Sequence, residues 1–227
     1  CADDAQWPPY SYTTDSSYVQ GFTAELVRTA LARHQVESEI VQMPWRRCLV
    51  EADRGEYFQV ALDSSFSEER GRKYLLTLPY YQLTPHYFYS RRAFPEGLNI
   101  SSGSELAAAG TICGLPGYNY SNFAIGDQAV YTGAPDFYAV ATMTHRGRCS
   151  LFLGRYEIIA GLARIDKDLL ADPDLAWAAI PDARPEPFYM LISRNFSQAE
   201  ALKSLLDQAI TEMTNNGELE RLLRQYR

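Results

Sequence analysis

At 227 residues the chain is long enough for two domains or for one large one, since an average domain has about 100–150 residues. Its composition, 46% hydrophobic and 22% charged, is that of a globular protein and excludes disorder and low-complexity repeats. A net charge of −7 excludes a basic surface that would hold nucleic acid or an anionic membrane.

The first part of the chain predicts alternating strands and helices. Pro44 suits the first turn of a helix and Gly55 suits its end. Apolar residues recur at helical spacing after Thr23, which is a suitable N-cap. This βαβαβ order implies a mostly parallel sheet with helices on both faces. The expected segments are a strand end at 1–4, a loop at 7–10, a helix from 23 to 31, a strand at 40–43, a helix at about 45–53 and a strand at 60–62.

The same pattern repeats later in the chain, and two extended segments, 86–90 and 188–192, join the two parts. A long amphipathic helix at 198–213 carries its apolar residues on one stripe. Two α/β units with two extended links indicate two lobes between which the chain crosses twice. The other segments are a helix at 105–109, a strand at 111–115, a Gly- and Tyr-rich loop at 117–121, a helix at 136–145, a strand at 151–153, and helices at 156–163 and about 217–226.

The four cysteines permit three disulfide pairings, and none of them lies in a CxxC motif. The three histidines are far apart in the sequence, so we expect no metal ion and no cofactor. An even number of cysteines favours disulfides in an oxidising compartment, and four buried thiols in a cytosolic protein are the alternative. No segment predicts a membrane-spanning helix or a signal peptide, so we expect a soluble chain that, if exported, is already processed.

Short motifs occur in a fixed order along the whole chain. They are Trp7-Pro8-Pro9-Tyr10, Gly21-Phe22-Thr23-Ala24-Glu25-Leu26, Pro44-Trp45, Asp63-Ser64-Ser65-Phe66-Ser67-Glu68-Glu69-Arg70, Pro79-Tyr80-Tyr81, Gly147-Arg148-Cys149-Ser150 and Asn216-Gly217-Glu218-Leu219. Each is weak alone. Together, in this order and spacing, they resemble the type II periplasmic solute-binding proteins, family 3, which serve ABC importers of polar amino acids.

The resemblance implies a two-lobed α/β fold in which each lobe is a mostly parallel sheet flanked by helices. Lobe I would comprise about 1–88 and 190–227, lobe II would be the inserted segment 89–189, and the hinge strands would lie at about 86–91 and 187–192. A small ligand would bind in the cleft between the lobes, which closes by hinge motion. The resemblance further implies a periplasmic monomer that works with an ABC transporter permease in the inner membrane.

The resemblance places the ligand's carboxylate on Arg70. Arginine suits this role because its planar guanidinium donates two parallel hydrogen bonds to a carboxylate. Ser65 and Asp63 lie on the segment that supplies further hydrogen bonds to the ligand's head group. The alternative for Arg70 is a solvated helix arginine paired with Glu69.

Three aromatic residues, Trp7, Tyr10 and Trp45, fall where the family lines its pocket with aromatic or apolar side chains. The alternative for each is ordinary core packing, since large aromatic residues are mostly buried for that reason. Asp3 falls where some relatives place an acid that contacts a cationic ligand side chain, and its alternative is a surface acid.

In lobe II, Tyr118, Asn119 and Tyr120 occupy the loop that closes on the carboxylate. Family members that bind α-amino acids place an aspartate at the end of the last lobe II strand, where it holds the ligand's ammonium group. In one register this position is Arg155, and in another it is Leu162. Neither register provides an acid, so the usual way of binding an amino acid is in question.

An arginine in place of that aspartate would repel an ammonium group in a dry cleft. Asp63 would then take over the amine from the opposite lobe, or pair with Arg70 or Arg155 in the empty cleft. Glu157 is a candidate partner that neutralises Arg155. These charges suggest a ligand with at least one anionic group, either a zwitterion in an unusual pose or a small dicarboxylate.

On the family's map the cysteines fall into two pairs. Cys1 and Cys48 belong to lobe I, and Cys113 and Cys149 belong to neighbouring strands of lobe II. The resemblance therefore implies one disulfide within each lobe and none between them, which leaves hinge motion free. A rival interpretation makes Cys1 the lipid-bearing cysteine of a lipoprotein.

Three classes of function follow from this resemblance. The first is a non-catalytic binding protein that delivers a small polar ligand to an ABC importer. The second is a sensory or accessory periplasmic module that is not coupled to transport. The third is an enzyme similar to cyclohexadienyl dehydratases, in which Asp63, Glu157 and Arg155 would supply the acid and the cation for an elimination.

Overall fold

The computed structural model describes residues 1–14, 17–125, 129–181 and 183–226. The chain folds into two compact units: unit 1 consists of Cys1–Gln82 and Pro187–Arg227, and unit 2 of Leu83–Glu186. The boundaries expected from the sequence, 88/89 and 189/190, lie a few residues after these two, which are 82/83 and 186/187. The first boundary differs because β6 (Pro85–Ser90) pairs along its whole length with strands of unit 2.

Unit 1 contains a parallel and an antiparallel group of strands. β1 pairs with β2 in parallel, and the backbone N–H of Leu62 donates to the carbonyl of Cys1 at 2.9 Å, which joins β1 to β3. β10 lies between β3 and β4 and runs antiparallel to both. The strands are β1 (Ala2–Asp3), β2 (Gln42–Met43), β3 (Val60–Ser65), β4 (Tyr74–Leu76), β5 (Tyr81–Leu83) and β10 (Glu186–Ser193).

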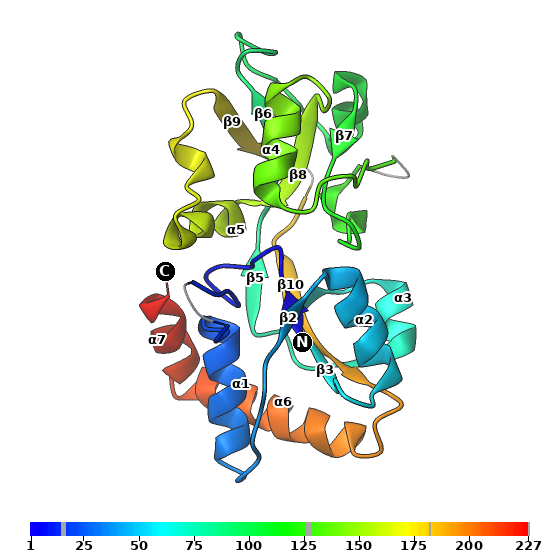
Figure 1. Cartoon of the computed structure of the whole chain (residues 1–227), viewed down its shortest axis with the longest axis vertical. Helices are drawn as coiled ribbons and strands as arrows, with labels where there is room; N and C mark the ends of the chain where they lie inside the picture. Colours follow the sequence, from blue (N-terminus) through cyan, green and yellow to red (C-terminus); the bar gives the residue numbers. More distant parts are fainter. Residues whose placement is uncertain (15–16, 126–128, 182, 227) are drawn as a thin grey trace. The chain divides into compact units, whose positions relative to one another are not determined.

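The helices of unit 1 pack around these strands (Figure 1). α1 contacts both α6 and α7, while α2 packs on β1 and β3. Gly55 ends α2 with φ of 72°, a left-handed conformation that glycine adopts without steric cost, as the sequence predicts. The helices are α1 (Phe22–Ala32), α2 (Trp45–Arg54), α3 (Glu68–Lys73), α6 (Ala199–Asn215) and α7 (Glu218–Gln225).

Unit 2 is built on a four-stranded sheet in the order β7-β8-β6-β9. Its core includes Tyr87, Leu106, Phe123 and Leu151. The carboxylate of Asp136 accepts a hydrogen bond from the N–H of Ala139 at 2.7 Å and so caps α4. Besides β6, the elements are β7 (Ile112–Cys113), β8 (Leu151–Arg155), β9 (Leu175–Ala179), α4 (Phe137–His145), α5 (Tyr156–Gly161) and the 3₁₀ turns Gly103–Ala109, Ser121–Phe123, Leu162–Ile165 and Leu169–Ala171.

The strand directions differ in part from the mostly parallel sheets that the sequence predicts. β1 and β2 are parallel, as are β7 and β8. The pairs formed by β6 and by β10 are antiparallel. These two strands carry the chain between the units, so they follow no βαβ crossover within a sheet, and only such crossovers require parallel pairing.

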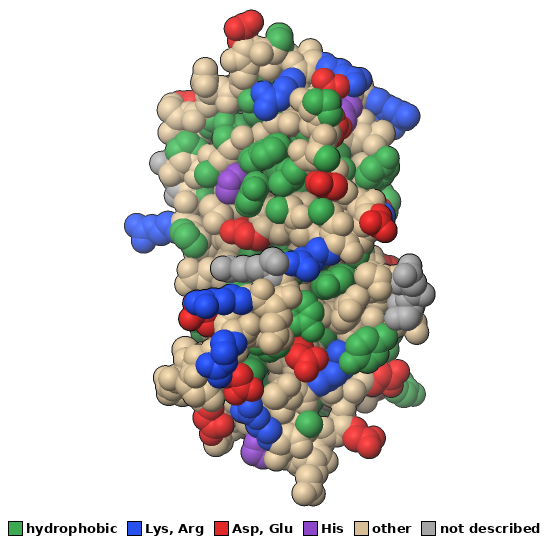
Figure 2. Space-filling view, turned by 90° about the vertical axis from the view of Figure 1, so that its left-hand side faces the viewer, with side chains coloured by type: hydrophobic (Ala, Val, Ile, Leu, Met, Phe, Trp, Pro, Cys, Tyr) green, Lys and Arg blue, Asp and Glu red, His purple; other side chains and the backbone are tan. Residues whose placement is uncertain are grey.

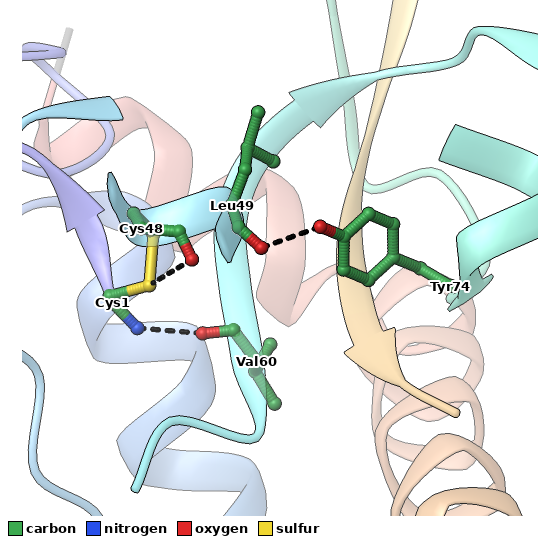
Figure 3. Close-up of a disulfide and its surroundings, with 5 residues drawn as sticks. All are labelled: Cys1, Cys48, Leu49, Val60 and Tyr74. Carbon is green, nitrogen blue, oxygen red and sulfur yellow. Dashed lines mark hydrogen bonds between the residues drawn. A yellow bond between two sulfur atoms is a disulfide. The ribbon is translucent and has the colours of Figure 1, made fainter. Parts of the chain in front are cut away.

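Each unit contains one of the two predicted disulfides. Cys1 is bonded to Cys48 in unit 1 and Cys113 to Cys149 in unit 2. Figure 3 shows the first bond and the hydrogen bonds around it: the nitrogen of Cys1 donates to the carbonyl of Val60, and the hydroxyl of Tyr74 donates to the carbonyl of Leu49, both at 2.6 Å. The disulfide therefore ties α2 to the first strand of unit 1.

Removing the disulfide of unit 2 is expected to lower stability substantially. The bond closes a loop with a sequence separation of 36 residues, and constraining an unfolded chain over such a loop contributes about 2–4 kcal/mol. The double substitution Cys113→Ser and Cys149→Ser should therefore lower the urea midpoint, measured by circular dichroism. The wild-type protein without reductant is the reference, and an unchanged midpoint would contradict the expectation.

The surface carries charges of both signs. On the face shown in Figure 2, basic and acidic side chains are interspersed among uncharged ones. Within the described ranges, no helix combines the length and the apolar character needed to span a membrane.

Candidate functional site

The corner between β3 and α3 positions the side chain that the sequence assigns to a ligand carboxylate. The hydroxyl of Ser67 accepts a hydrogen bond from the N–H of Arg70 at 3.2 Å and so caps α3 directly after the strand. Glu68 and Glu69 lie in the first turn, where negative charge is favourable. This short turn brings Arg70 back toward the end of β3.

The Arg70 side chain is buried, with only 8% of the residue exposed. Its Nη1 donates to the carbonyl and to the hydroxyl of Ser65, at 3.0 and 3.3 Å. Its guanidinium carbon lies 5.7 Å from the ring centre of Trp45, a cation–π contact. Because Arg70 is buried, it is not the solvated helix arginine of the alternative interpretation, and the carboxylate of Glu69 accepts a hydrogen bond from Lys73 at 2.9 Å.

Four aromatic residues of unit 1 form one group of packed rings. Tyr10 stacks on Tyr81 with ring centres 3.8 Å apart, and Tyr81 stacks on Phe188 at 4.9 Å. Trp7 packs on Phe188 at 5.7 Å, and its indole N–H donates to the hydroxyl of Tyr81 at 3.0 Å. Tyr81 and Phe188 are not among the predicted site residues, although the Pro79-Tyr80-Tyr81 motif was a signal for Tyr81.

Asp63 is held by hydroxyl groups. Its carboxylate accepts hydrogen bonds from Ser11 and Thr23, each at 2.5 Å, and from the hydroxyls of Tyr81 at 3.0 Å and Tyr80 at 3.1 Å. Burial raises the pKa of this carboxyl above 3.8, and the four hydrogen bonds oppose that shift. All four donors belong to unit 1.

Asp3 is not a surface acid, because only 8% of the residue is exposed. Its carboxylate accepts a hydrogen bond from the N–H of Ala5 at 3.0 Å, and its carbonyl accepts one from the Gln42 side chain at 2.9 Å. The charge of Asp3 therefore lies inside unit 1, at the end of β1.

In unit 2, Arg155 forms a buried ion pair with Glu186. The two residues are each 2% exposed. Nε of Arg155 donates to Glu186 at 2.9 Å and Nη2 at 2.5 Å, and Nη2 also donates to the carbonyl of Asn119 at 3.1 Å. The side-chain amide of Asn122 donates to the second oxygen of Glu186 at 2.5 Å. Glu186 is not among the predicted site residues, and its position just before the second extended segment was the only sequence signal for a role there.

Glu157, the partner that the sequence suggests for Arg155, has a different role. Its carboxylate accepts hydrogen bonds from the N–H and the hydroxyl of Thr84, at 3.1 and 3.0 Å. Arg155, the N-cap of α5, is thus bonded to Glu186, the last residue of unit 2. Glu157, in the first turn of α5, is bonded to Thr84, the second residue of unit 2.

The loop at 118–120 is held from several sides. The ring of Tyr118 packs edge-on against Phe137 at 6.0 Å. The side chain of Asn119 accepts hydrogen bonds from the N–H and the hydroxyl of Ser121, at 3.1 and 2.7 Å. The hydroxyl of Tyr120 bonds the backbone of Leu115. Internal bonds thus shape this loop in unit 2.

An apolar pocket of about 650 Å³ lies elsewhere in unit 1, lined by α1, α6 and the segments 36–41 and 57–60. The charged residues around it are the acids Glu37 and Glu39, so it is poorly suited to a carboxylate. The predicted ligand residues do not line it. The part of the chain that the structure describes contains no group of three His, Cys, Asp or Glu side chains placed to hold a metal ion.

Comparison with known proteins assigns the chain to one family. The sequence matches the bacterial extracellular solute-binding proteins, family 3, over residues 1–227. The chain belongs to this family. The sequence motifs thus identify the family correctly, and the two units are the α/β lobes of a type II periplasmic binding protein.

Solved structures of amino acid-binding proteins resemble the chain over nearly its whole length. A mutant of the arginine-binding protein of T. maritima gives a TM-score of 0.78 at 16% identity, covering 99% of this chain and 93% of that one. An amino acid ABC transporter substrate-binding protein of Streptococcus pneumoniae, bound to L-arginine, gives 0.76 at 16% identity, covering 99% and 92%.

A third structure connects this solute-binding fold to an enzyme. An ancestral amino acid-binding protein, described as a precursor of cyclohexadienyl dehydratase, gives a TM-score of 0.74 at 16% identity, covering 99% and 93%. At such identities the likeness of these structures concerns the fold. No curated protein sequence matches the chain.

Proposed function

We propose that this family 3 protein captures a small polar ligand with at least one carboxylate and delivers it to an ABC importer from the periplasm. The observation that carries the proposal is the buried guanidinium of Arg70, which Ser65 and Trp45 hold in place. A buried, pre-oriented arginine is the side chain best suited to bind a carboxylate.

The charges of the two units favour an anionic ligand recognised mainly by Arg70. Arg155 is neutralised by Glu186, so we assign it to support of the loop that contains Asn119. Asp63 is occupied by four hydroxyl groups. Of the acids considered for an amine, Asp3 is left as the candidate contact.

The other ligand contacts that we propose follow from the family resemblance. The ligand's side chain would lie against Trp7 and Trp45, while Tyr10 supports them from within the stacked group. Tyr118, Asn119 and Tyr120 would contribute from lobe II when the ligand is enclosed. A dicarboxylate and an amino acid with an acidic side chain both meet these requirements.

Isothermal titration calorimetry with a panel of compounds tests the proposal. The panel contains L-glutamate, L-glutamine, L-arginine, succinate and D-glucose, of which L-glutamate is both an amino acid and a dicarboxylate. We expect a carboxylate-bearing compound, with L-glutamate first, to bind more tightly than D-glucose. A preference for D-glucose would contradict the proposal. Co-purification with permease components would separate an importer from a sensor.

An enzymatic role is less well supported by the geometry. The three groups considered for an elimination are Asp63, Glu157 and Arg155, and each is engaged within its own unit by hydroxyl groups, by Thr84 or by Glu186. We therefore propose binding without catalysis. Incubation with prephenate and arogenate, followed by chromatography of the products, is the corresponding check, and turnover would overturn this assignment.

A further inference from the structure

Asp63 has an unusual backbone conformation within β3. Its φ is +57°, in the left-handed region that non-glycine residues seldom adopt. The pairing between β3 and β10 shifts register between Tyr189 and Leu191, opposite this residue. Such a β-bulge turns a side chain away from the direction that a regular strand would give it. The strained position lies in the segment that also contains Ser65, and strained backbone of this kind is common at functional sites.

Hydrogen bonds lock this conformation. The hydroxyl of Tyr80 donates to the carboxylate of Asp63 and accepts from its backbone N–H, at 3.1 and 3.2 Å. Burial and the nearby carboxylate raise the pKa of Tyr80 and Tyr81 well above 10.0, so both stay protonated as donors at neutral pH. The carboxylate is thereby joined to the loop at Ser11, to α1 at Thr23 and to the aromatic pair at 80–81.

One branch of this network reaches Trp7, one of the proposed ligand contacts. The indole N–H of Trp7 donates to the hydroxyl of Tyr81 at 3.0 Å. That hydroxyl donates in turn to Oδ1 of Asp63, also at 3.0 Å. The ring of Tyr81 lies between Tyr10 and Phe188 in the stack. The carboxylate thus sets the direction of the Tyr81 hydroxyl, and that hydroxyl sets the direction of the indole.

We propose that Asp63 is a positioning residue, which orients Trp7 through the Tyr81 hydroxyl and so shapes the aromatic wall of the ligand site without touching the ligand. This inference rests on the proposed function and deepens it. It replaces the direct contact between Asp63 and an amine that the sequence suggests. A carboxylate suits this role because both of its oxygens accept hydrogen bonds, here from Ser11 on one oxygen and from three hydroxyls on the other, whereas the NH2 group of an amide donates and cannot accept.

The test follows the indole N–H signals of the three tryptophans by ¹⁵N NMR in the ligand-free protein. Trp45→Phe and Trp177→Phe variants assign the signals. We expect Asp63→Asn and Tyr81→Phe each to shift the Trp7 signal and to leave that of Trp177 unchanged. The double variant should shift it no further than either single variant, because both changes interrupt one chain of hydrogen bonds.

Thr23→Val is the matched control, since it removes another hydroxyl donor to the same oxygen of Asp63 but leaves the branch to Trp7 intact. It should lower stability and leave the Trp7 signal in place. A Trp7 signal that stays unchanged in Asp63→Asn, or that shifts as much in Thr23→Val, would overturn the proposal.

Calorimetry with L-glutamate distinguishes positioning from direct contact. A positioning role predicts that Asp63→Asn and Tyr81→Phe weaken binding to a similar extent, about tenfold, which corresponds to 1.4 kcal/mol. A loss confined to Asp63→Asn would indicate direct contact and contradict positioning. If the wild-type protein does not bind L-glutamate, that result counts against the proposed ligand, and the NMR signals still decide the role of Asp63.

Discussion

Replacing Arg70 by alanine is expected to weaken the binding of L-glutamate by about 100-fold. Removing one partner of a buried, hydrogen-bonded charge pair costs about 2–5 kcal/mol, and each 1.4 kcal/mol corresponds to a factor of about ten in affinity. Calorimetry on the purified variant measures the loss. Circular dichroism shows whether the variant is still folded.

Arg72→Ala is the matched control for Arg70. Arg72 lies on the same helix, its side chain is 71% exposed, and it pairs loosely with Glu68 at 3.6 Å. Both variants lose one positive charge from α3, so a general electrostatic effect would appear in both. Arg70→Lys should also bind weakly, because an ammonium group lacks the planar pair of donors. Equal affinities of Arg70→Ala and Arg72→Ala for L-glutamate would show that Arg70 does not bind the ligand.

Replacing Glu186 by alanine is expected to destabilise unit 2 by about 3–5 kcal/mol, because it leaves the buried guanidinium of Arg155 without its counter-charge. The amide of Asn122 and the loop at Asn119 would lose contacts at the same time, since both are bonded to this pair. Urea unfolding of the variant and the wild type measures the difference in the free energy of unfolding.

Asp174→Ala provides the comparison for Glu186. Asp174 also forms an ion pair within unit 2, with Arg92, but the two side chains are 34% and 68% exposed. Such exposed pairs contribute about 0–1 kcal/mol. If both variants lose a similar free energy of unfolding, burial does not strengthen the Arg155–Glu186 ion pair, which would contradict the prediction.

Local sequence signals predicted much of the fold. Pro44 and Gly55 bracket α2, and Asp136 immediately precedes α4. These features depend on one or two neighbouring residues, because capping and glycine's conformational freedom act within a turn. The long apolar stripe of α6 is likewise a local pattern. The pairing of the cysteines was inferred instead from the family resemblance.

The short strands and the pairing directions were harder to predict. β4, β5 and β9 are 3, 3 and 5 residues long and were not predicted. β4 and β5 have too few residues to show an alternating pattern, and β9, with the sequence Leu-Ala-Trp-Ala-Ala, is apolar throughout and does not alternate. The existence of such strands depends on a partner far away in the sequence, as with β10, which pairs with both β3 and β4.

The candidate site shows the same division between local and long-range information. The sequence by itself pointed to Arg70, Ser65 and three aromatic residues as the proposed ligand contacts, because they stand in motifs that resemble those of the family. Only the tertiary structure decided their partners. Glu186 and Arg155 are 31 positions apart and Tyr81 and Trp7 are 74 apart.

Length and a net charge of −7 are compatible with one domain or two, and they do not show which charges are paired. Composition counts charges but does not say which ones are neutralised. The half-buried Asp63 is bonded by hydroxyl groups and the buried Arg155 by Glu186, each within its own unit. Whether a buried charge faces a ligand or a neighbour depends on where folding brings distant residues together, and that is a property of the packed chain.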